Sequence, residues 1–302
     1  MTANVYSAPA KINLFLHVVG RRPDGYHLIQ SVFRLIDLAD ELTIVATDDG
    51  RVVRDGRVEG VAEDDDLAIR AARSLQAASR TTCGATISIR KRIPMGGGLG
   101  GGSSDAATVL LALNRLWGLD WPCSRLMTLG AALGADVPFF IGGTDAFVEG
   151  IGERLTPVVL PEAHYAIVHP GVSVPTATIF GAPELTRDTE IIKISDFSSD
   201  DPDGAAQETR GARLRFRNDL EAVATARFDA VRAALAWLSR CGDDDWIGAL
   251  GPARMSGSGA CVFRAFDSAD HAAACIATLP SRWSGWIARG MVHHPLKGCC
   301  VD

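Results

Sequence analysis

Hydrophobic and polar positions in the first half of the chain follow the two-residue period of strands in some segments and helical spacing in others. Residues 10–19 and 40–47 are apolar runs that predict strands. Residues 64–79 start with acidic side chains and continue with the spacing of an amphipathic helix. Residues 85–93 alternate apolar and polar side chains, which predicts a half-buried strand. The first half therefore mixes strands and helices.

A glycine-rich stretch, PMGGGLGGGSSDAA at residues 94–107, follows the last of these strands. Behind it, residues 103–119 have the spacing of an apolar helix, with Ser103 or Ser104 as the expected N-cap and Gly118 as its end. Each glycine inside an element costs roughly 0.5–1 kcal/mol relative to alanine, so a cluster needs a reason. Unpaired N–H groups and the dipole of a helix start attract anions. The order strand, glycine turn, helix favours an anion site over a slack linker.

Several phosphate-binding patterns compete for this loop. The dinucleotide pattern G-x-G-x-x-G fits Gly96, Gly98 and Gly101, but the loop lies too far along the chain, and Asp120 follows a helix rather than a strand. A Walker A loop needs a lysine after the glycines, and none follows them. Protein kinases need an HRD sequence that does not occur. A glycine-rich loop of another ATP-using class remains.

The second half has a different organisation. Residues 195–212 are polar and predict a loop or a partly disordered insertion. Residues 227–240 predict an amphipathic helix, and residues 260–266, 268–279 and 285–292 predict a strand, a helix and a strand. This order suggests an open α+β second domain.

Composition and charge limit the function classes. The chain has 302 residues, of which 47% are hydrophobic and 22% are charged, which is typical of a globular protein. The net charge is −6 without a basic stripe, which argues against nucleic acid as a partner. No apolar run approaches the roughly 18–20 residues that cross a bilayer, and we expect neither a membrane association nor a signal peptide.

The cysteine content favours reduced thiols. Seven cysteines at scattered positions make a disulfide framework improbable, and the absence of a CxxC pair disfavours zinc. Cys299 and Cys300 could bind a metal only with help from His293 and His294. The favoured interpretation is a cytoplasmic protein with ordinary buried thiols.

Three ordered motifs resemble those of the GHMP kinases, the superfamily of galactokinase, homoserine, mevalonate and phosphomevalonate kinases. The glycine stretch resembles the central phosphate-binding motif, SAPAKINLFLHVVGRRPDGYHLIQSVF (7–33) the first motif, and RMSGSGACVF (254–263) the third. The DGYH sequence, LGADVPFF (133–140) and HPGVSVPTATIF (169–180) resemble the kinases that act on 4-diphosphocytidyl-2-C-methyl-D-erythritol.

The resemblance implies a two-domain α+β GHMP kinase fold. It implies an N-terminal ATP-binding domain over residues 1–157 and a ferredoxin-like α+β domain over residues 158–302. The implied reaction transfers the γ-phosphate of ATP, with Mg²⁺, to the 2-hydroxyl of 4-diphosphocytidyl-2-C-methyl-D-erythritol in the non-mevalonate (MEP) isoprenoid pathway. The expected partner is this small molecule, and the expected oligomeric state is a monomer or weak homodimer.

Two residues are candidates for the chemistry. Asp136 precedes an apolar run, where a carboxylate serves equally well as a general base or as a helix cap. Lys11 is a cation in an apolar strand, where a lysine with its ammonium group in solvent is the simpler interpretation. The resemblance implies that Asp136 is the catalytic base, and that Lys11 keeps it ionised and neutralises developing charge.

The resemblance also implies binding residues. Asn13 would lie on the same strand face as Lys11 and bind substrate. Tyr26 would stack on cytosine, His27 would bond to its edge, and Thr176 and Phe180 would complete that pocket. The expected ATP-binding residues are Pro94, Met95, Gly96, Gly97, Gly98, Leu99, Gly100, Gly101, Gly102, Ser103 and Ser104. The expected third-motif residues near the phosphates are Gly257, Ser258 and Gly259.

One position departs from the family pattern, and two other functions stay open. Asp66 stands where family members often have asparagine near the adenine pocket, and an ionised aspartate cannot donate a hydrogen bond. The first alternative function is another GHMP kinase with a small alcohol or diphosphate substrate, which leaves DGYH unexplained. The second is a nucleotide-sensing module without catalysis, which needs neither Lys11 nor Asp136.

Overall fold

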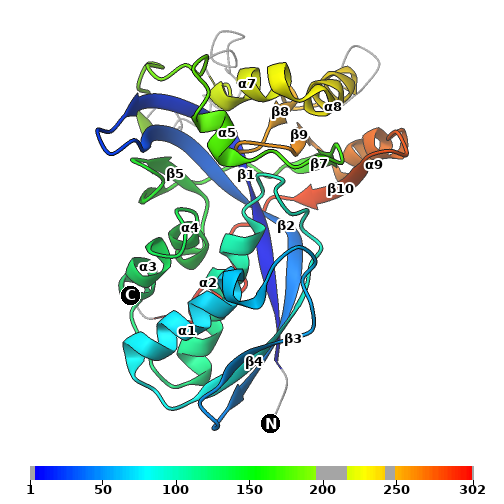
Figure 1. Cartoon of the computed structure of the whole chain (residues 1–302). Coiled ribbons are helices and arrows are strands. Elements are labelled where there is room, and N and C mark those ends of the chain that lie inside the picture. The colour runs from blue at the N-terminus through cyan, green and yellow to red at the C-terminus, as the bar shows by residue number, and fades with distance from the viewer. Residues whose placement is uncertain (1–3, 195–215, 242–248, 301–302) are drawn as a thin grey trace.

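A computed structural model describes residues 4–194, 216–241 and 249–300 of the chain. Two sheets, each covered by helices, are connected by one long hairpin that runs between them (Figure 1). This architecture confirms the predicted two-domain α+β fold. The polar segment 195–212 lies outside the described residues, so its predicted loop character stays a prediction.

The first sheet is six-stranded and mostly antiparallel. Its order is β3-β4-β2-β5-β6, with β1 paired to β2, and β3 runs parallel to β4. The strands are β1 (Asn4–Arg21), β2 (His27–Thr47), β3 (Val52–Asp55), β4 (Gly84–Arg90), β5 (Ala146–Glu149) and β6 (Arg154–Pro157). β1 and β2 are much longer than the sequence pattern predicts, because they continue as a paired hairpin to Arg21 and His27, where Leu16 and Val18 pack with side chains of the second half.

Helices cover one face of this sheet. They are the short 3-10 helix η1 (Glu63–Asp65), α1 (Leu67–Ser79), α2 (Gly101–Leu116), α3 (Cys123–Ala131) and α4 (Val137–Gly142). α2 is the central one, because every residue from Ser104 to Asn114 is buried against the sheet and the other helices. This packing fixes the position of the α2 N-terminus, which the glycine loop enters.

The second sheet has four antiparallel strands in the order β10-β7-β9-β8. The strands are β7 (His164–His169), β8 (Arg254–Met255), β9 (Val262–Phe266) and β10 (Ser284–Arg289). The helices of this half are α5 (Thr176–Phe180), α7 (Asp219–Arg227), α8 (Asp229–Arg240) and α9 (Ala269–Ala277). Counted along the chain from β7, the strands lie in the order four, one, three, two. This is the ferredoxin-like arrangement that the resemblance implied.

The two halves exchange segments rather than meeting at one linker. Leu16 and Val18 of β1 are buried in the hydrophobic core of the second half, among side chains of β7, β9, α7 and α8. In return, Met291 and Leu296 near the end of the chain pack against the first core. The boundary between residues 157 and 158 therefore stays a prediction, and the C-terminal segment belongs by its packing to the first half.

The cysteines depart from the expectation of reduced thiols at one pair. Cys123 at the start of α3 and Cys300 form a disulfide, with their Cα atoms 5.0 Å apart. The pairing was invisible in the sequence because 177 positions separate the two residues and only the returning C-terminal segment brings them together. No metal-binding group of three His, Cys, Asp or Glu side chains occurs in the described part of the chain. Among those residues, no helix is long and apolar enough to cross a membrane.

Candidate active site

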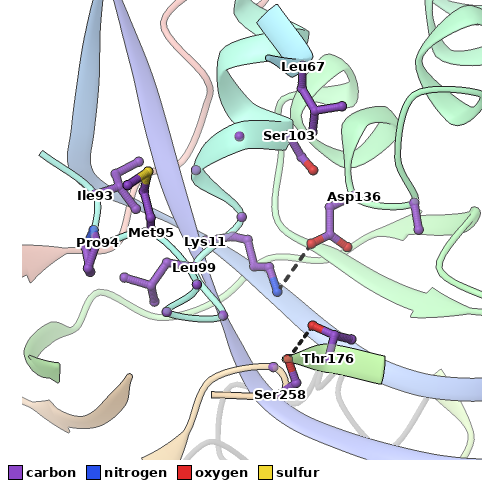
Figure 2. A pocket seen from close by; sticks show the side chains of 18 of the residues that line it. Lys11, Leu67, Ile93, Pro94, Met95, Leu99, Ser103, Asp136, Thr176 and Ser258 are labelled. Carbon is purple, nitrogen blue, oxygen red and sulfur yellow. Dashed lines mark hydrogen bonds and ion pairs between the residues drawn. The ribbon is translucent and has the colours of Figure 1, made fainter. Parts of the chain in front are cut away.

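A cavity of about 700 Å³ lies where the glycine loop, the start of α4 and the third motif meet (Figure 2). The glycine loop lines it from Pro94 to Ser103. The other predicted residues in its walls are Lys11, Asn13, Asp136, Thr176, Phe180, Gly257 and Ser258. Residues from both halves of the fold, far apart in sequence, therefore converge on one site.

Backbone hydrogen bonds hold the glycine loop in place. The amide of Lys11 donates to the carbonyl of Leu99 at 3.0 Å, which ties the loop to β1. From the third motif, the Ser256 hydroxyl donates to the Gly98 carbonyl at 2.9 Å. The amide of Ala260 donates to the Gly96 carbonyl at 3.2 Å. The third motif thus supports the loop from behind.

The helix after the loop begins earlier than predicted. Gly100, in the left-handed conformation with φ +73°, is the N-cap residue of α2, and no side chain caps the helix. The prediction of Ser103 or Ser104 as N-cap is therefore wrong. The Ser104 hydroxyl is buried and donates to the carbonyl of Pro9 at 2.6 Å. Since the first amides of a helix have no partner within it, the uncapped start of α2 leaves N–H groups for an anion.

Lys11 and Asp136 face each other across the cavity (Figure 2). The Lys11 Nζ lies 3.6 Å from the Asp136 Oδ2 and 2.5 Å from the Asn13 Oδ1. The Lys11 side chain is 5% exposed, and burial lowers its pKa, while the Asp136 carboxylate opposes that shift. This burial rules out a surface lysine that extends into solvent.

Asp136 occupies the N-cap position of α4, but its carboxylate does not cap the helix. The carboxylate is 29% exposed and points into the cavity (Figure 2). The carboxylate lies beside the Lys11 ammonium instead of bonding to the helix, and its role as a general base stays a prediction.

Asn13 lies beside Lys11 on the same strand face, as predicted. Its Nδ2 donates to the Ser31 hydroxyl at 3.0 Å, and its Oδ1 accepts from Lys11. The amide of Asn13 donates to the Ser256 hydroxyl at 3.2 Å. Asn13 is therefore held from several sides and orients the Lys11 ammonium, in addition to any contact with substrate.

Apolar side chains line one end of the cavity. Val58, Val61, Leu67, Ile89 and Ile93 form these walls, beside Asp66. This end suits a flat, weakly polar group such as a nucleobase.

Asp66 itself is engaged by the protein. Its carboxylate accepts from the Arg54 Nη1 at 2.9 Å and from the amide of Ala68 at 3.0 Å, which makes it the N-cap of α1. The doubt about an adenine contact at this position has a structural reason, because both carboxylate oxygens already have protein partners.

A buried cluster beneath the loop was not predicted from the sequence. Lys91 contacts Asp40 and donates to the Asp105 Oδ2 at 2.7 Å. Asp40 also accepts from the amides of Arg92 and Ile93, at 2.6 and 2.8 Å, where β4 turns into the loop. Burial raises the pKa of Asp105 to about 7, and the Lys91 ammonium opposes this shift. By parity Lys91 falls on the apolar face of the alternating residues 85–93, which is the one sign in the sequence that this lysine is buried.

The predicted substrate residues form a second group at the other end. The Thr176 hydroxyl lies 2.8 Å from that of Ser258, which joins α5 to the third motif. The His27 ring lies 5.1 Å from the Phe180 ring, centre to centre. Tyr26 is 61% exposed and outside the cavity lining, as is His27. The stacking role of Tyr26 stays a prediction.

Gly259 also lies outside the cavity lining. It has φ +92°, and a Cβ there would lie 2.8 Å from the Met255 Sδ. Its contribution is to the turn of the third motif, whereas Gly257 and Ser258 reach the cavity.

Comparisons with known proteins agree with this arrangement. The model of the GHMP kinases N terminal domain matches residues 66–144, and that of the GHMP kinases C terminal domain matches residues 205–285. A 4-diphosphocytidyl-2-C-methyl-D-erythritol kinase of Ralstonia pickettii (strain 12J) is 55% identical over 97% of this chain and 96% of its own. One from Thiobacillus denitrificans (strain ATCC 25259 / T1) is 52% identical over 97% and 98%.

Solved structures show the same relationship. The crystal structure of a 4-(cytidine 5'-diphospho)-2C-methyl-D-erythritol kinase superposes with a TM-score of 0.76 at 35% identity, over 95% of this chain and 99% of the other. A mevalonate kinase at 14% identity and a TM-score of 0.63 shares the fold, over 95% of this chain and 99% of its own. The chain therefore belongs to the GHMP kinases and, among them, to the family of 4-diphosphocytidyl-2-C-methyl-D-erythritol kinases.

Proposed function

We propose that this chain uses ATP to phosphorylate the 2-hydroxyl of 4-diphosphocytidyl-2-C-methyl-D-erythritol, with Mg²⁺ as the metal ion. The observation that carries the proposal is the Lys11–Asp136 pair, 3.6 Å apart, in a cavity bounded by an uncapped helix start. Phosphoryl transfer needs mainly positioning, charge stabilisation and a group that accepts the hydroxyl proton. All three are available at this one site.

Each residue has a defined task in this proposal. The Asp136 carboxylate accepts the proton of the attacking hydroxyl. The Lys11 ammonium, oriented by Asn13, faces both that carboxylate and the cavity, so it stabilises negative charge that develops there. The first amides of α2 bind phosphate oxygens, and the apolar end formed around Leu67 holds the adenine.

The residues present fit a magnesium ion that is held mainly by phosphates. Mg²⁺ keeps several waters and usually takes one or two protein oxygens together with substrate phosphates. Ser103, at the start of α2, offers such an oxygen to the cavity (Figure 2). The bound ion would neutralise phosphate charge during transfer.

The nucleobase half of the substrate would bind at the DGYH turn. His27 and Phe180 lie beside each other there, and the exposed Tyr26 is available for stacking. A GHMP kinase that acts on a short alcohol would not need these aromatic side chains, because its substrate has no nucleobase. A nucleotide-sensing module would have no use for a buried lysine paired with a carboxylate.

Measurement of kcat/KM for the full substrate and for methylerythritol phosphate without cytidine tests the proposal, in wild type, Tyr26→Ala and Tyr26→Phe. Stacking of a base on an aromatic ring is worth about 1–3 kcal/mol, or roughly 5- to 150-fold in rate. We expect that loss in Tyr26→Ala only, with an unchanged KM for ATP, because the phenylalanine variant keeps the ring. Equal wild-type rates on the two substrates would refute the cytidine specificity.

A further inference from the structure

Arg187 lies in the segment after α5 and is bound on every side by acceptors. Its Nη2 donates to the carbonyls of Phe180 at 3.2 Å and Ala182 at 2.6 Å. Its Nη1 donates to the carbonyl of Leu185 at 2.9 Å and reaches that of Pro183 at 3.5 Å. The guanidinium plane is therefore fixed by its own segment.

The Nε–H of this guanidinium is directed at His27, one of the predicted substrate residues. The Arg187 Nε donates to the His27 Nε2 at 3.0 Å, across 160 positions of sequence. His27 belongs to the start of β2, and its ring lies beside that of Phe180. A side chain anchored in the second half of the fold thus holds a ring of the first half at the predicted nucleobase site.

The chemistry of the two groups decides where the His27 proton lies. Arginine stays protonated and offers only donors, so the His27 Nε2 must be the acceptor of this bond. A neutral imidazole has one N–H, which must then be on Nδ1. Burial and the nearby Arg187 and Arg21 cations lower the pKa of His27, which keeps the ring neutral at pH 7. Among the described residues, no protein group bonds to Nδ1, so its N–H is available to a ligand.

We propose that Arg187 is a positioning residue for nucleobase selection, which fixes His27 as the Nδ1–H tautomer and so presents a hydrogen-bond donor to the acceptor edge of cytosine. This inference rests on the proposed function. A donor at this point suits cytosine, whose N3 is an acceptor, and opposes uracil, whose N3 carries a hydrogen. Arg187, which does not contact the base itself, would then determine through His27 the selectivity of the site for cytidine diphosphate over uridine diphosphate.

Three variants separate this role from a structural one. Arg187→Met removes every donor, and Arg187→Lys keeps the charge and one donor group. The control is Arg227→Met, because Arg227 fastens the same segment through Glu184, at 2.8 and 3.0 Å, without touching His27. We expect Arg187→Met to raise KM for the full substrate by about 2- to 12-fold, the scale of the hydrogen bond between the neutral His27 ring and the base. Arg187→Lys should recover part of that loss, and KM for ATP should stay constant throughout.

The effect must also act through His27. In a His27→Ala background, Arg187→Met should leave KM unchanged, because the ring that Arg187 orients is gone. Competition with the nucleotide alone should show that CDP inhibits wild type better than UDP, and that this preference shrinks in Arg187→Met. An equal loss with and without His27, or the same loss in Arg227→Met, would overturn the proposal.

The tautomer itself can be observed in the wild type, with a His27 variant needed only for assignment. Nitrogen-15 NMR of histidine-labelled wild type should show His27 protonated at Nδ1 and unprotonated at Nε2, with assignment from the His27→Ala spectrum. A ring protonated at Nε2 would overturn the positioning role even if the enzyme acts on its proposed substrate. If the wild type does not phosphorylate the proposed substrate but shows the expected tautomer, the proposed function alone is refuted.

Discussion

The glycine loop offers a sharp structural test at Gly98. This residue has φ +75°, and a Cβ added to it would lie 2.1 Å from the backbone oxygen of Ser256. The added atom would therefore meet the third motif rather than the cavity. Gly98→Ala should disturb the contact between the two halves of the fold, and any loss of ATP binding would follow from that disturbance.

The size of the effect can be worked out from the contacts. A left-handed backbone costs a non-glycine residue about 1–2 kcal/mol. The hydrogen bond from the Ser256 hydroxyl to the Gly98 carbonyl would break as the loop moves, and the neighbouring bond from Ala260 to Gly96 would weaken, at about 0.5–1.5 kcal/mol each. The free energy of unfolding should fall by about 2–4 kcal/mol, which for a chain of 302 residues corresponds to a Tm lower by about 3–6 °C.

The matched control is Gly102→Ala. A Cβ at Gly102 would meet only the Leu67 Cδ1, at 3.5 Å, which is an ordinary contact. Alanine is also the better helix former, so Tm should stay constant or rise, while the narrower cavity lowers the affinity for ATP. Thermal melts by circular dichroism and titration with an ATP analogue measure both. A Gly98→Ala variant with the wild-type Tm would refute the packing argument.

Two further predictions concern stability. Burial raises the pKa of Asp105 from 3.8 to about 7, so the stability that its protonated form contributes is complete below about pH 4 and is lost as the pH rises through about 7. Tm measured from pH 5 to 8 should therefore fall more steeply in wild type than in Asp105→Asn. Parallel curves for the two proteins would contradict this. The Cys123–Cys300 disulfide should stabilise the fold by about 2–4 kcal/mol, so dithiothreitol should lower the Tm of wild type but not that of Cys300→Ser, and equal sensitivity would contradict the pairing.

Local patterns carried the prediction of the loop and its surroundings. The alternation over residues 85–93 and the helical spacing after the glycines placed β4 and α2 correctly, because both elements are specified by nearby side chains. The N-cap was placed wrongly because serine side chains usually cap helices, whereas here the Ser104 hydroxyl bonds to Pro9 across the fold. An uncapped start is a feature of a site that leaves its amides to a ligand.

Contacts between distant segments were beyond the reach of sequence patterns. Arg187 and His27 lie 160 positions apart, and nothing in either neighbourhood indicates the other. The same holds for Lys91, whose partners Asp40 and Asp105 come from β2 and α2. The resemblance to a kinase family supplied Lys11, Asn13 and Asp136, and only the structure shows that the Asn13 Oδ1 accepts a hydrogen bond from Lys11.

The most direct test of the account measures turnover and ATP binding of Asp136→Asn together. Asparagine keeps the size of the side chain but cannot accept the hydroxyl proton, and general base catalysis is worth about 10²–10⁴-fold in rate. The account predicts that kcat on the cytidine substrate falls by at least about a hundredfold, while the affinity for an ATP analogue stays within about threefold of wild type. Retention of more than about a tenth of the wild-type kcat would contradict the assignment of Asp136 as the base.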